Sequence, residues 1–503
     1  MFIIGIYLSV LVIVTLVIIG RDAINGSVPL FSARNFFLAG VLLFQTISGA
    51  LTGFTDLTEN GAEINYPLQS AFIFSGILTV FTIIFLVAYR KFDSAERLAA
   101  KRTRIRMTTK SSLVVAGVVI VVIGIVLRFA GESISYVAVL LPQMSAGILC
   151  AGVALLTMAW ARASFNVAIA LVLAVGTSAA GLALLVGAFG RREILGLFFA
   201  IAWGLYWEKW RLMPASRLIL RVLIAGVSMA IPFLLFSGAR VGGENADRSI
   251  VGQIQNIVDV DARKVQEAAI ASLSGQFAGG ISMWIVDARN TDGGYYPLHS
   301  LIYFTTMPIP RDYWSTKPVG LGLSIVSEAN IQGVSAEHSW GPGLVGHLYH
   351  DIVFISLPLY ALILAFAFRY MDARTMFSAG RDPLTIVVFG SALGQILGMP
   401  RGDLGLFAFH MVSAYAGAWI VGRIVCGAVL RIDREAEALE AEGYTHDANA
   451  DDGYADDEHR EYSAFPEGSK DQNGSWDKNG SWEQNASWDG ETPAFPVRSA
   501  QER

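Results

Sequence analysis

Apolar runs of about twenty residues recur along most of the chain, and they limit it to one kind of fold. A helix of this length crosses the hydrocarbon core of a bilayer, where each backbone amide must find its partner within the protein. Of the 503 residues, 53% are hydrophobic and only 16% are charged, proportions that exclude an ordinary soluble domain. We therefore predict an all-α polytopic membrane protein with about eleven transmembrane helices. The apolar runs lie at 2–20, 36–54, 69–89, 111–129, 143–160, 164–189, 194–207, 217–237, 350–368, 384–400 and 404–426.

The basic residues between these runs predict how the chain crosses the membrane. Lysines and arginines are densest between Arg90 and Lys110, and such clusters stay on the cytoplasmic side. Alternation from that connection places the N-terminus outside, the C-terminal tail in the cytoplasm and the one long connection outside. Residues 1–20 lack a charged leader, so we expect a first membrane span and not a cleaved signal peptide.

Four regions follow from this threading. Residues 1–237 form a transmembrane bundle, and residues 238–349 form the long outer loop, which begins with an amphipathic helical pattern and continues with aromatic and turn residues. Residues 350–430 supply the closing transmembrane helices. Residues 431–503 are acidic and repeat an Asn-x-Ser-Trp sequence, a composition that predicts a disordered cytoplasmic tail.

Several arginines fall on the outer side, where the topology rule gives no reason for them. Arg191 and Arg192 stand between two apolar runs, Arg311 and Lys317 stand among prolines in the long loop, and Arg401 precedes a Gly-Asp turn. A guanidinium group binds a phosphate with two directed hydrogen bonds, and a lysine ammonium group adds a point charge. We therefore predict that these five residues bind phosphate groups. Interface anchoring stays open for the Arg191–Arg192 pair, and helix capping stays open for the turn at Arg401.

The outer loop also offers an acid–base pair. Glu337 and His338 lie just before the chain re-enters the membrane, where a carboxylate or imidazole can take a proton from a hydroxyl group. The alternative is that these residues only make structural hydrogen bonds within the loop. His347, His350 and Asp351 form too short a cluster to predict a metal ion, and we expect neither metal nor cofactor. The sequence has no phosphate-binding loop, dinucleotide fingerprint or nucleic-acid signature.

The outer motifs resemble those of bacterial O-antigen polymerases of the Wzy type, the oligosaccharide repeat unit polymerases. The number of spans and the long outer loop before the last spans agree with that family. Two positions depart from its pattern: Ala336 stands where a glycine is usual, and Ser339-Trp340 stands in place of asparagine-phenylalanine. The motifs that carry the resemblance are Gly190-Arg191-Arg192, Pro308-Ile309-Pro310-Arg311 with Trp314 and Lys317-Pro318, Glu337 with Trp340-Gly341-Pro342-Gly343, and Arg401-Gly402-Asp403-Leu404.

The resemblance implies a GT-C-like membrane glycosyltransferase in the bacterial inner membrane with its active site facing the periplasm. Its substrates would be glycans linked to undecaprenyl pyrophosphate, which it joins into O-antigen or exopolysaccharide. The arginines would stabilise the pyrophosphate leaving group without a metal, and Glu337 or His338 would activate the acceptor hydroxyl. A chain-length regulator and a flippase would be partners, alongside membrane lipid and no nucleic acid.

Two other classes of protein stay open. An O-antigen ligase-type glycosyltransferase would share the arginines and differ in its acceptor. A polysaccharide transporter or flippase would carry broken helices at mid-membrane and often an internal repeat. The sequence shows no clear repeat, and its unexplained charges lie at one face of the membrane.

Overall fold

Every regular element in the described part of the chain is a helix. The structure is a computed structural model, and it gives the backbone of most of the chain. The described residues are 1–54, 66–100, 109–133, 140–185, 191–239, 252, 255, 258–273, 278–311, 313–329 and 339–450.

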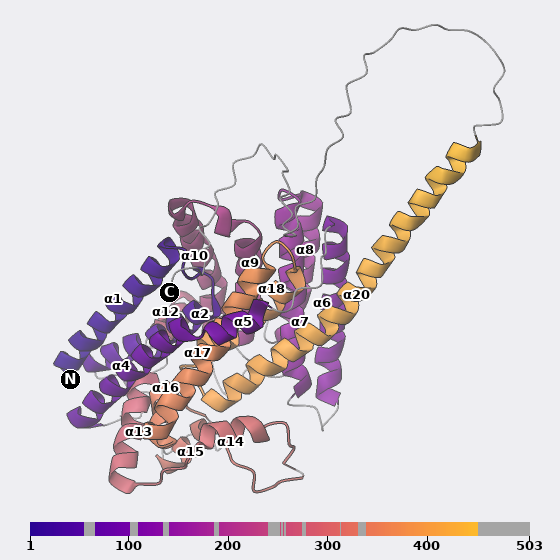
Figure 1. Cartoon of the computed structure of the whole chain (residues 1–503). Coiled ribbons are helices and arrows are strands. Elements are labelled where there is room, and N and C mark those ends of the chain that lie inside the picture. Colours follow the sequence, from indigo (N-terminus) through magenta and orange to yellow (C-terminus); the bar gives the residue numbers. More distant parts are fainter. Residues whose placement is uncertain are drawn as a thin grey trace, which may run out of the picture. The chain divides into compact units, whose positions relative to one another are not determined.

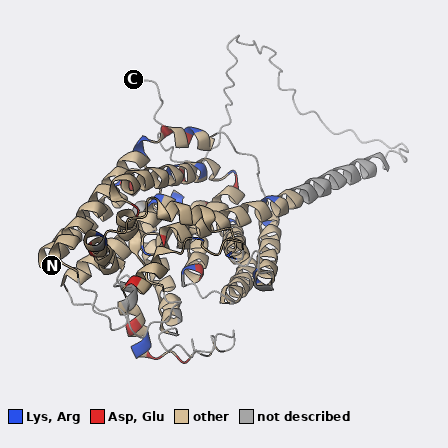
Figure 2. Cartoon of the chain, turned by 90° about the horizontal axis from the view of Figure 1, so that it is seen from below, with Lys and Arg blue, Asp and Glu red and all other residues tan. Residues whose placement is uncertain are grey.

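Nine helices within these residues are long and apolar enough to cross a membrane. Their ribbons carry few charged residues along their length (Figure 2). The prediction of a polytopic helical membrane protein is confirmed. The nine are α1 (Phe2–Ile24), the continuous segment of α2 (Ala33–Gly40), η1 (Val41–Ile47) and α3 (Ser48–Phe54), α4 (Leu68–Lys91), α6 (Lys110–Ser133), α7 (Leu140–Arg162), α8 (Val167–Leu185), α10 (Ala215–Ala239), α17 (Val353–Ser378) and α20 (Leu404–Ala450).

Two further predicted runs form shorter helices. The run at 194–207 lies within α9 (Arg191–Glu208), and the run at 384–400 is divided between α18 (Pro383–Gly390) and α19 (Leu393–Gly398). A total of about eleven spans therefore stays a prediction.

The long loop is helical where the structure describes it. In Figure 1 its later helices gather at one end of the bundle, beside the start of α20. The amphipathic pattern predicted at the start of the loop coincides in part with the first helix, although many of the residues before it lie outside the described set. The loop helices are α12 (Ala262–Leu273), α13 (Ala278–Asp292), α14 (His299–Thr306), α15 (Leu321–Glu328) and α16 (Gly343–His350).

The C-terminal tail differs from its prediction at its beginning. The sequence predicts disorder from residue 431, whereas α20 continues to Ala450. Residues 431–450 are rich in Ala and Glu, which favour helix, and a helix that is already nucleated extends at little cost. Residues 451–503 lie outside the described set.

Close glycine packing attaches α13 to the membrane bundle. A Cβ on Gly279 would lie 2.5 Å from the backbone nitrogen of Gly49, so only glycine permits this approach. The amide of Gly279 donates to Ser48 Oγ at 3.1 Å. The long loop is therefore packed against the second membrane segment and not merely tethered to it.

Gln45 joins three separate parts of the chain at this contact. It lies in η1, a π-helical turn inside the second segment. Its Nε2 donates to the carbonyl of Pro400 at 2.9 Å, and its Oε1 accepts from Ser282 Oγ at 3.3 Å and from the amide of Val345 at 3.4 Å. Gln45 thus links α13, α16 and the turn that precedes α20.

Paired charges hold together one end of the bundle. Arg34 is fully buried and donates to Asp22 at 2.6 Å. Asp372 in α17 accepts hydrogen bonds from the amide of Ala33 at 2.6 Å and from the hydroxyl of Tyr89 at 2.8 Å. These contacts join α1, α2, α4 and α17 at the ends that the threading places in the cytoplasm.

A second set of pairs lies at ends that the threading places outside. Arg128 at the end of α6 pairs with Glu193 at the start of α9 at 3.2 Å, and both side chains are buried. Ser70 at the start of α4 donates to Asp287 of α13 at 3.0 Å. Ion pairs that join different segments of the described chain link ends predicted on the same side, which agrees with the predicted alternation of the helices.

The orientation itself can be tested with reporter fusions. Fusions after Lys110 and after residue 440 should fluoresce as green fluorescent protein, because the basic cluster before Lys110 stays in the cytoplasm. Fusions after Arg192 and at residue 290 should instead be active as alkaline phosphatase, which works only after export. Phosphatase activity after Lys110 combined with fluorescence at residue 290 would reverse the assignment.

Candidate functional site

Arg192 faces an aromatic ring of α20. Its guanidinium carbon lies 4.4 Å from the centroid of the Phe407 ring, a cation–π contact. Its Nε is buried and has no hydrogen-bond partner among the described residues. The start of α9 also packs tightly on α19, since a Cβ on Gly394 would lie 2.3 Å from the carbonyl oxygen of Arg192. Arg192 is therefore fixed in position, and its Nε–H group can still donate a hydrogen bond to a ligand.

The turn from α19 to α20 packs against the same ring of Phe407. A Cβ on Gly402 would lie 2.1 Å from the Phe407 ring, so a larger residue would displace the turn. Arg401 comes directly before this glycine, and its carbonyl oxygen accepts a hydrogen bond from the amide of Gly343 at 3.0 Å. Phe407 thus contacts both the guanidinium group of Arg192 and the turn that contains Arg401.

Asp403 closes this turn and faces the outer loop. Its Oδ1 accepts a hydrogen bond from the amide of Leu406 at 3.2 Å, which caps α20. Its Oδ2 is buried without a hydrogen-bond partner in the described part of the chain. Burial and the Asp403 carboxylate raise the pKa of Tyr303 to about 12, while Arg311 acts in the opposite direction. A Cβ on Gly320 would lie 2.7 Å from Asp403 Oδ2 and 3.2 Å from the Tyr303 hydroxyl oxygen, so these two groups lie close together, and Arg311 bonds to the carbonyl of Pro318 two residues before Gly320.

Arg311 and Lys317 have different roles in the loop after α14. Arg311 is exposed, and its guanidinium donates to the carbonyls of Lys317 at 3.3 Å and Pro318 at 3.4 Å. Lys317 is only 8% exposed, and its Nζ donates to the carbonyls of Met307 at 3.1 Å and Ile309 at 2.9 Å. The ammonium group of Lys317 therefore closes the loop, and the more accessible cation is Arg311.

Three of the predicted residues lie beyond what the structure describes. Glu337 and His338 are outside the described residues. Arg191 begins α9, but the position of its side chain is not described. The arginines of the predicted set whose side chains are described are Arg192, Arg311 and Arg401. Arg192 and the turn of Arg401 meet at Phe407, and Arg311 bonds near Gly320, which packs on Asp403.

A buried hydrogen-bond network supports the turn from behind. His347 Nε2 accepts from the amide of Leu404 at 3.1 Å, so the ring proton must be on Nδ1, which lies 2.7 Å from Ser300 Oγ. Asp351 Oδ2 accepts from the amide of Ser300 at 2.8 Å and from the hydroxyl of Tyr360 at 2.6 Å. Burial lowers the pKa of His347, so the neutral ring positions the first residue of α20.

The donor atoms of His299, His350 and Asp351 lie within 4.8 Å of one another, yet they suit a metal ion poorly. Arg289 Nε donates to His350 Nδ1 at 3.0 Å, which leaves the proton of the neutral ring on Nε2. A protonated nitrogen has no lone pair for a metal, and the guanidinium group repels a cation. Burial and the charge of Arg289 lower the pKa of His350 to about 2. The expectation of a metal-independent protein stays a prediction.

Two polar residues near the arginines escaped the sequence reasoning. Gln395 Oε1 in α19 and His410 Nδ1 in α20 are buried and have no hydrogen-bond partner among the described residues. His410 follows Phe407 by three positions, so both lie on one face of α20. That spacing was the only signal in the sequence. Buried polar atoms without partners are uncommon in native proteins and call for an explanation, such as a ligand that completes them.

The chain was compared with protein-family models, with curated proteins and with solved structures, and none of them matches it. The chemistry of the site therefore rests on its own residues. It combines guanidinium groups with buried acceptors and donors that have no hydrogen-bond partner in the described part of the chain, and it lies against membrane helices. Such a site is suited to an anionic head group.

The role of His347 can be tested through stability. Replacing His347 by Phe removes the acceptor for the amide of Leu404 and leaves that buried donor unpaired, which costs about 1–3 kcal/mol. Thermal unfolding of the purified protein in detergent should show a lower Tm. Thr305→Val is the matched control, because Thr305 is an exposed residue of α14 that bonds only within its own helix. Equal Tm values for the two variants would refute a supporting role for His347.

Proposed function

We propose that this protein is a membrane glycosyltransferase that joins oligosaccharide repeat units. Its substrates are glycans carried on undecaprenyl pyrophosphate, and its product is an O-antigen or exopolysaccharide chain. The observation that carries the proposal is the grouping of Arg192, Arg311 and the turn of Arg401 at one end of the bundle. The resemblance of the same arginine motifs to O-antigen polymerases supports it.

The proposed reaction needs stabilisation of a leaving pyrophosphate. Negative charge accumulates on that group as the glycosidic bond to the donor breaks, and guanidinium groups already in position stabilise it without rearrangement. Arg192 and Arg401 approach from the membrane helices, whereas Arg311 approaches from the outer loop. In this proposal Lys317 stabilises the loop that carries Arg311, because its ammonium group bonds to the carbonyls of Met307 and Ile309.

The acceptor hydroxyl needs a group that takes its proton, because arginine does not deprotonate. Glu337 and His338 remain our proposed candidates. Gly341, four residues after Glu337 in the sequence, packs against Arg401: a Cβ there would lie 2.7 Å from the Arg401 carbonyl oxygen. The chain therefore leads from the proposed base directly to the proposed phosphate site.

The proposed setting is the bacterial inner membrane, with the arginine end facing the periplasm. In this arrangement α9 and the α18–α19 pair also cross the membrane, which gives about eleven spans. A flippase would deliver the lipid-linked units, and a chain-length regulator would limit the product. The acidic tail would lie in the cytoplasm, away from the reaction.

Arginine-to-lysine variants test the phosphate site. Each of Arg192→Lys, Arg311→Lys and Arg401→Lys keeps the charge but loses the fork that makes two directed hydrogen bonds. Losing one charge-assisted hydrogen bond costs about 1.5–3 kcal/mol, which is about one to two decades in rate. The measurement is the glycan ladder from a polymerase-null strain complemented with each variant, with protein levels checked by immunoblot.

Arg263→Lys is the control for these variants. Arg263 is an exposed residue of α12 that pairs only with Glu267, and its ladder should match that of the unchanged protein. Full-length ladders from all three site variants would remove the phosphate-binding role. Transfer of glycan to a lipid core without any ladder would indicate a ligase-type enzyme instead.

The proposed base gives a separate prediction. Glu337→Gln should abolish ladder formation while binding of a lipid-linked donor to the purified protein stays unchanged, because the amide cannot accept the proton but fills the same volume. His338→Gln tests the neighbouring candidate in the same way. If both variants give normal ladders, the proton acceptor lies elsewhere.

A further inference from the structure

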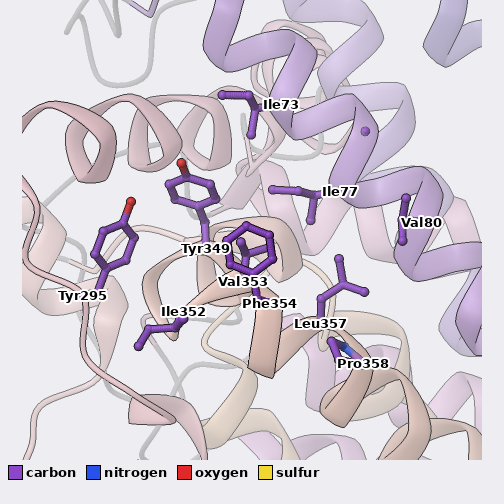
Figure 3. A pocket seen from close by; sticks show the side chains of 11 residues that line it. Ile73, Ile77, Val80, Tyr295, Tyr349, Ile352, Val353, Phe354, Leu357 and Pro358 are labelled. Carbon is purple, nitrogen blue, oxygen red and sulfur yellow. The ribbon is translucent and has the colours of Figure 1, made fainter.

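An apolar groove of about 700 Å³ lies between α4 and α17, away from the arginines. Figure 3 shows Ile73, Ile77 and Val80 of α4 facing the first turns of α17 across it. Its volume is within the usual range for a ligand pocket, about 300–1,000 Å³. The remaining lining residues are Gly76, Tyr295, Tyr349, Ile352, Val353, Phe354, Leu357 and Pro358.

The groove lies on a surface that faces the hydrocarbon of the bilayer. Both helices that form it are candidate membrane spans. Phe354 is 88% exposed and Val80 is 46% exposed, and exposed apolar side chains of a membrane span contact lipid. A hydrocarbon chain is therefore the occupant that the surroundings of the groove supply.

One end of the groove is polar. Figure 3 shows the rings of Tyr295 and Tyr349 side by side at this end, with their hydroxyl groups on the same side, and the ring centroids are 6.0 Å apart. The hydroxyl of Tyr349 donates to Asn290. The groove thus changes from carbon-lined to hydrogen-bonding along its length, as a lipid does from tail to head group.

The backbone at the lip of the groove is strained. Ile352 has a φ of +66°, which is an outlier for a β-branched residue. Such strain persists where the surrounding structure enforces it, and it is concentrated at functional sites. Pro358, one turn and a half further along α17, has no amide hydrogen to donate to the carbonyl of Phe354.

Helix α16 lies between this groove and the turn that leads into α20. Tyr349 and His347 are two positions apart on α16, which is about 200° around the helix axis, so they face opposite ways. Tyr349 lines the groove, whereas His347 bonds to Leu404 beside Asp403. The distance across one helix is about 10 Å.

We propose that the α4–α17 groove binds the isoprenoid tail of a lipid-linked glycan whose head group is handled at the arginine site. The identity of this lipid rests on the function proposed above. The groove holds the chain about one helix diameter from the turn at Leu404, and the tyrosine hydroxyls meet the polar end of the lipid. Binding the tail here lowers the freedom of the head group before reaction.

Gly76 allows the groove to be filled without disturbing the fold. A Cβ at this position would meet no atom within 4 Å, and the same is true of Gly226 on the exposed surface of α10. Gly76→Phe therefore places a ring in the groove, whereas Gly226→Phe adds the same ring to a membrane span elsewhere. Matched elution from a sizing column and matched Tm values would show that both variants fold.

The test is photo-crosslinking of the full-length protein in nanodiscs with a diazirine-bearing undecaprenyl pyrophosphate, followed by mass spectrometry. Labels should map to residues 73–80 and 352–358, and Gly76→Phe should reduce them at least about tenfold, the effect of 1.4 kcal/mol in binding. Gly226→Phe should label like the unchanged protein. Excess unlabelled undecaprenyl phosphate should compete, and phosphatidylglycerol should not.

Either of two results would overturn the inference. Labelling of the groove that survives Gly76→Phe would show that the tail lies elsewhere, and equal competition by phosphatidylglycerol would show that ordinary bilayer lipid fills the groove. The polymerase proposal is judged separately by the glycan ladder. Specific groove labelling without any ladder would retain an isoprenoid-binding groove and reject the polymerase.

Discussion

The bundle depends on pairing charges that a membrane cannot solvate. An unpaired charge at membrane depth costs several kcal/mol, yet Arg34 is buried between helices and Asp372 accepts hydrogen bonds from two of them. The Arg34–Asp22 pair joins two consecutive helices, whereas the Asp372 contacts join α17 to helices near the start of the chain. The apolar surfaces then pack around these points, since lipid tails are as apolar as the side chains and give little drive for association.

The opposite end of the bundle, around Phe407, has a different hydrogen-bonding pattern. There, Arg192, Asp403 and His410 each bury a polar atom without a hydrogen-bond partner among the described residues. Ion pairs such as Arg34–Asp22 thus hold one end of the bundle, whereas several buried polar atoms around Phe407 have no hydrogen-bond partner among the described residues. A site of this kind gains most from a ligand that brings acceptor oxygens to Arg192 and hydroxyl donors to Asp403, because the cost of burying these polar groups is already included in the stability of the fold.

The apolar runs were enough to predict the nine candidate membrane helices of the described residues, because length and hydropathy are what a spanning segment requires. The arginines were selected because the predicted topology places them outside, where basic residues are not expected. Their grouping around Phe407 was not predictable, since it depends on close contacts at Gly394 and Gly402 that only the folded backbone defines. Lys317 shows the same limit: its sequence context predicts a phosphate contact, whereas its ammonium group is directed at two carbonyl oxygens.

The π-helical turn η1 makes the outer site sensitive to register. A π-turn contains one residue more than the α-helical turn it replaces, and here it aims Gln45 at Pro400, Ser282 and Val345 together. Removing one residue from 41–47 would restore an α-helix and rotate everything on one side of it by about 100°. The second span would still cross the membrane, but its side chains would no longer match the loop. An insertion or deletion in this span therefore matters mainly because it rotates the following side chains about the helix axis, and much less because it changes the length of the helix.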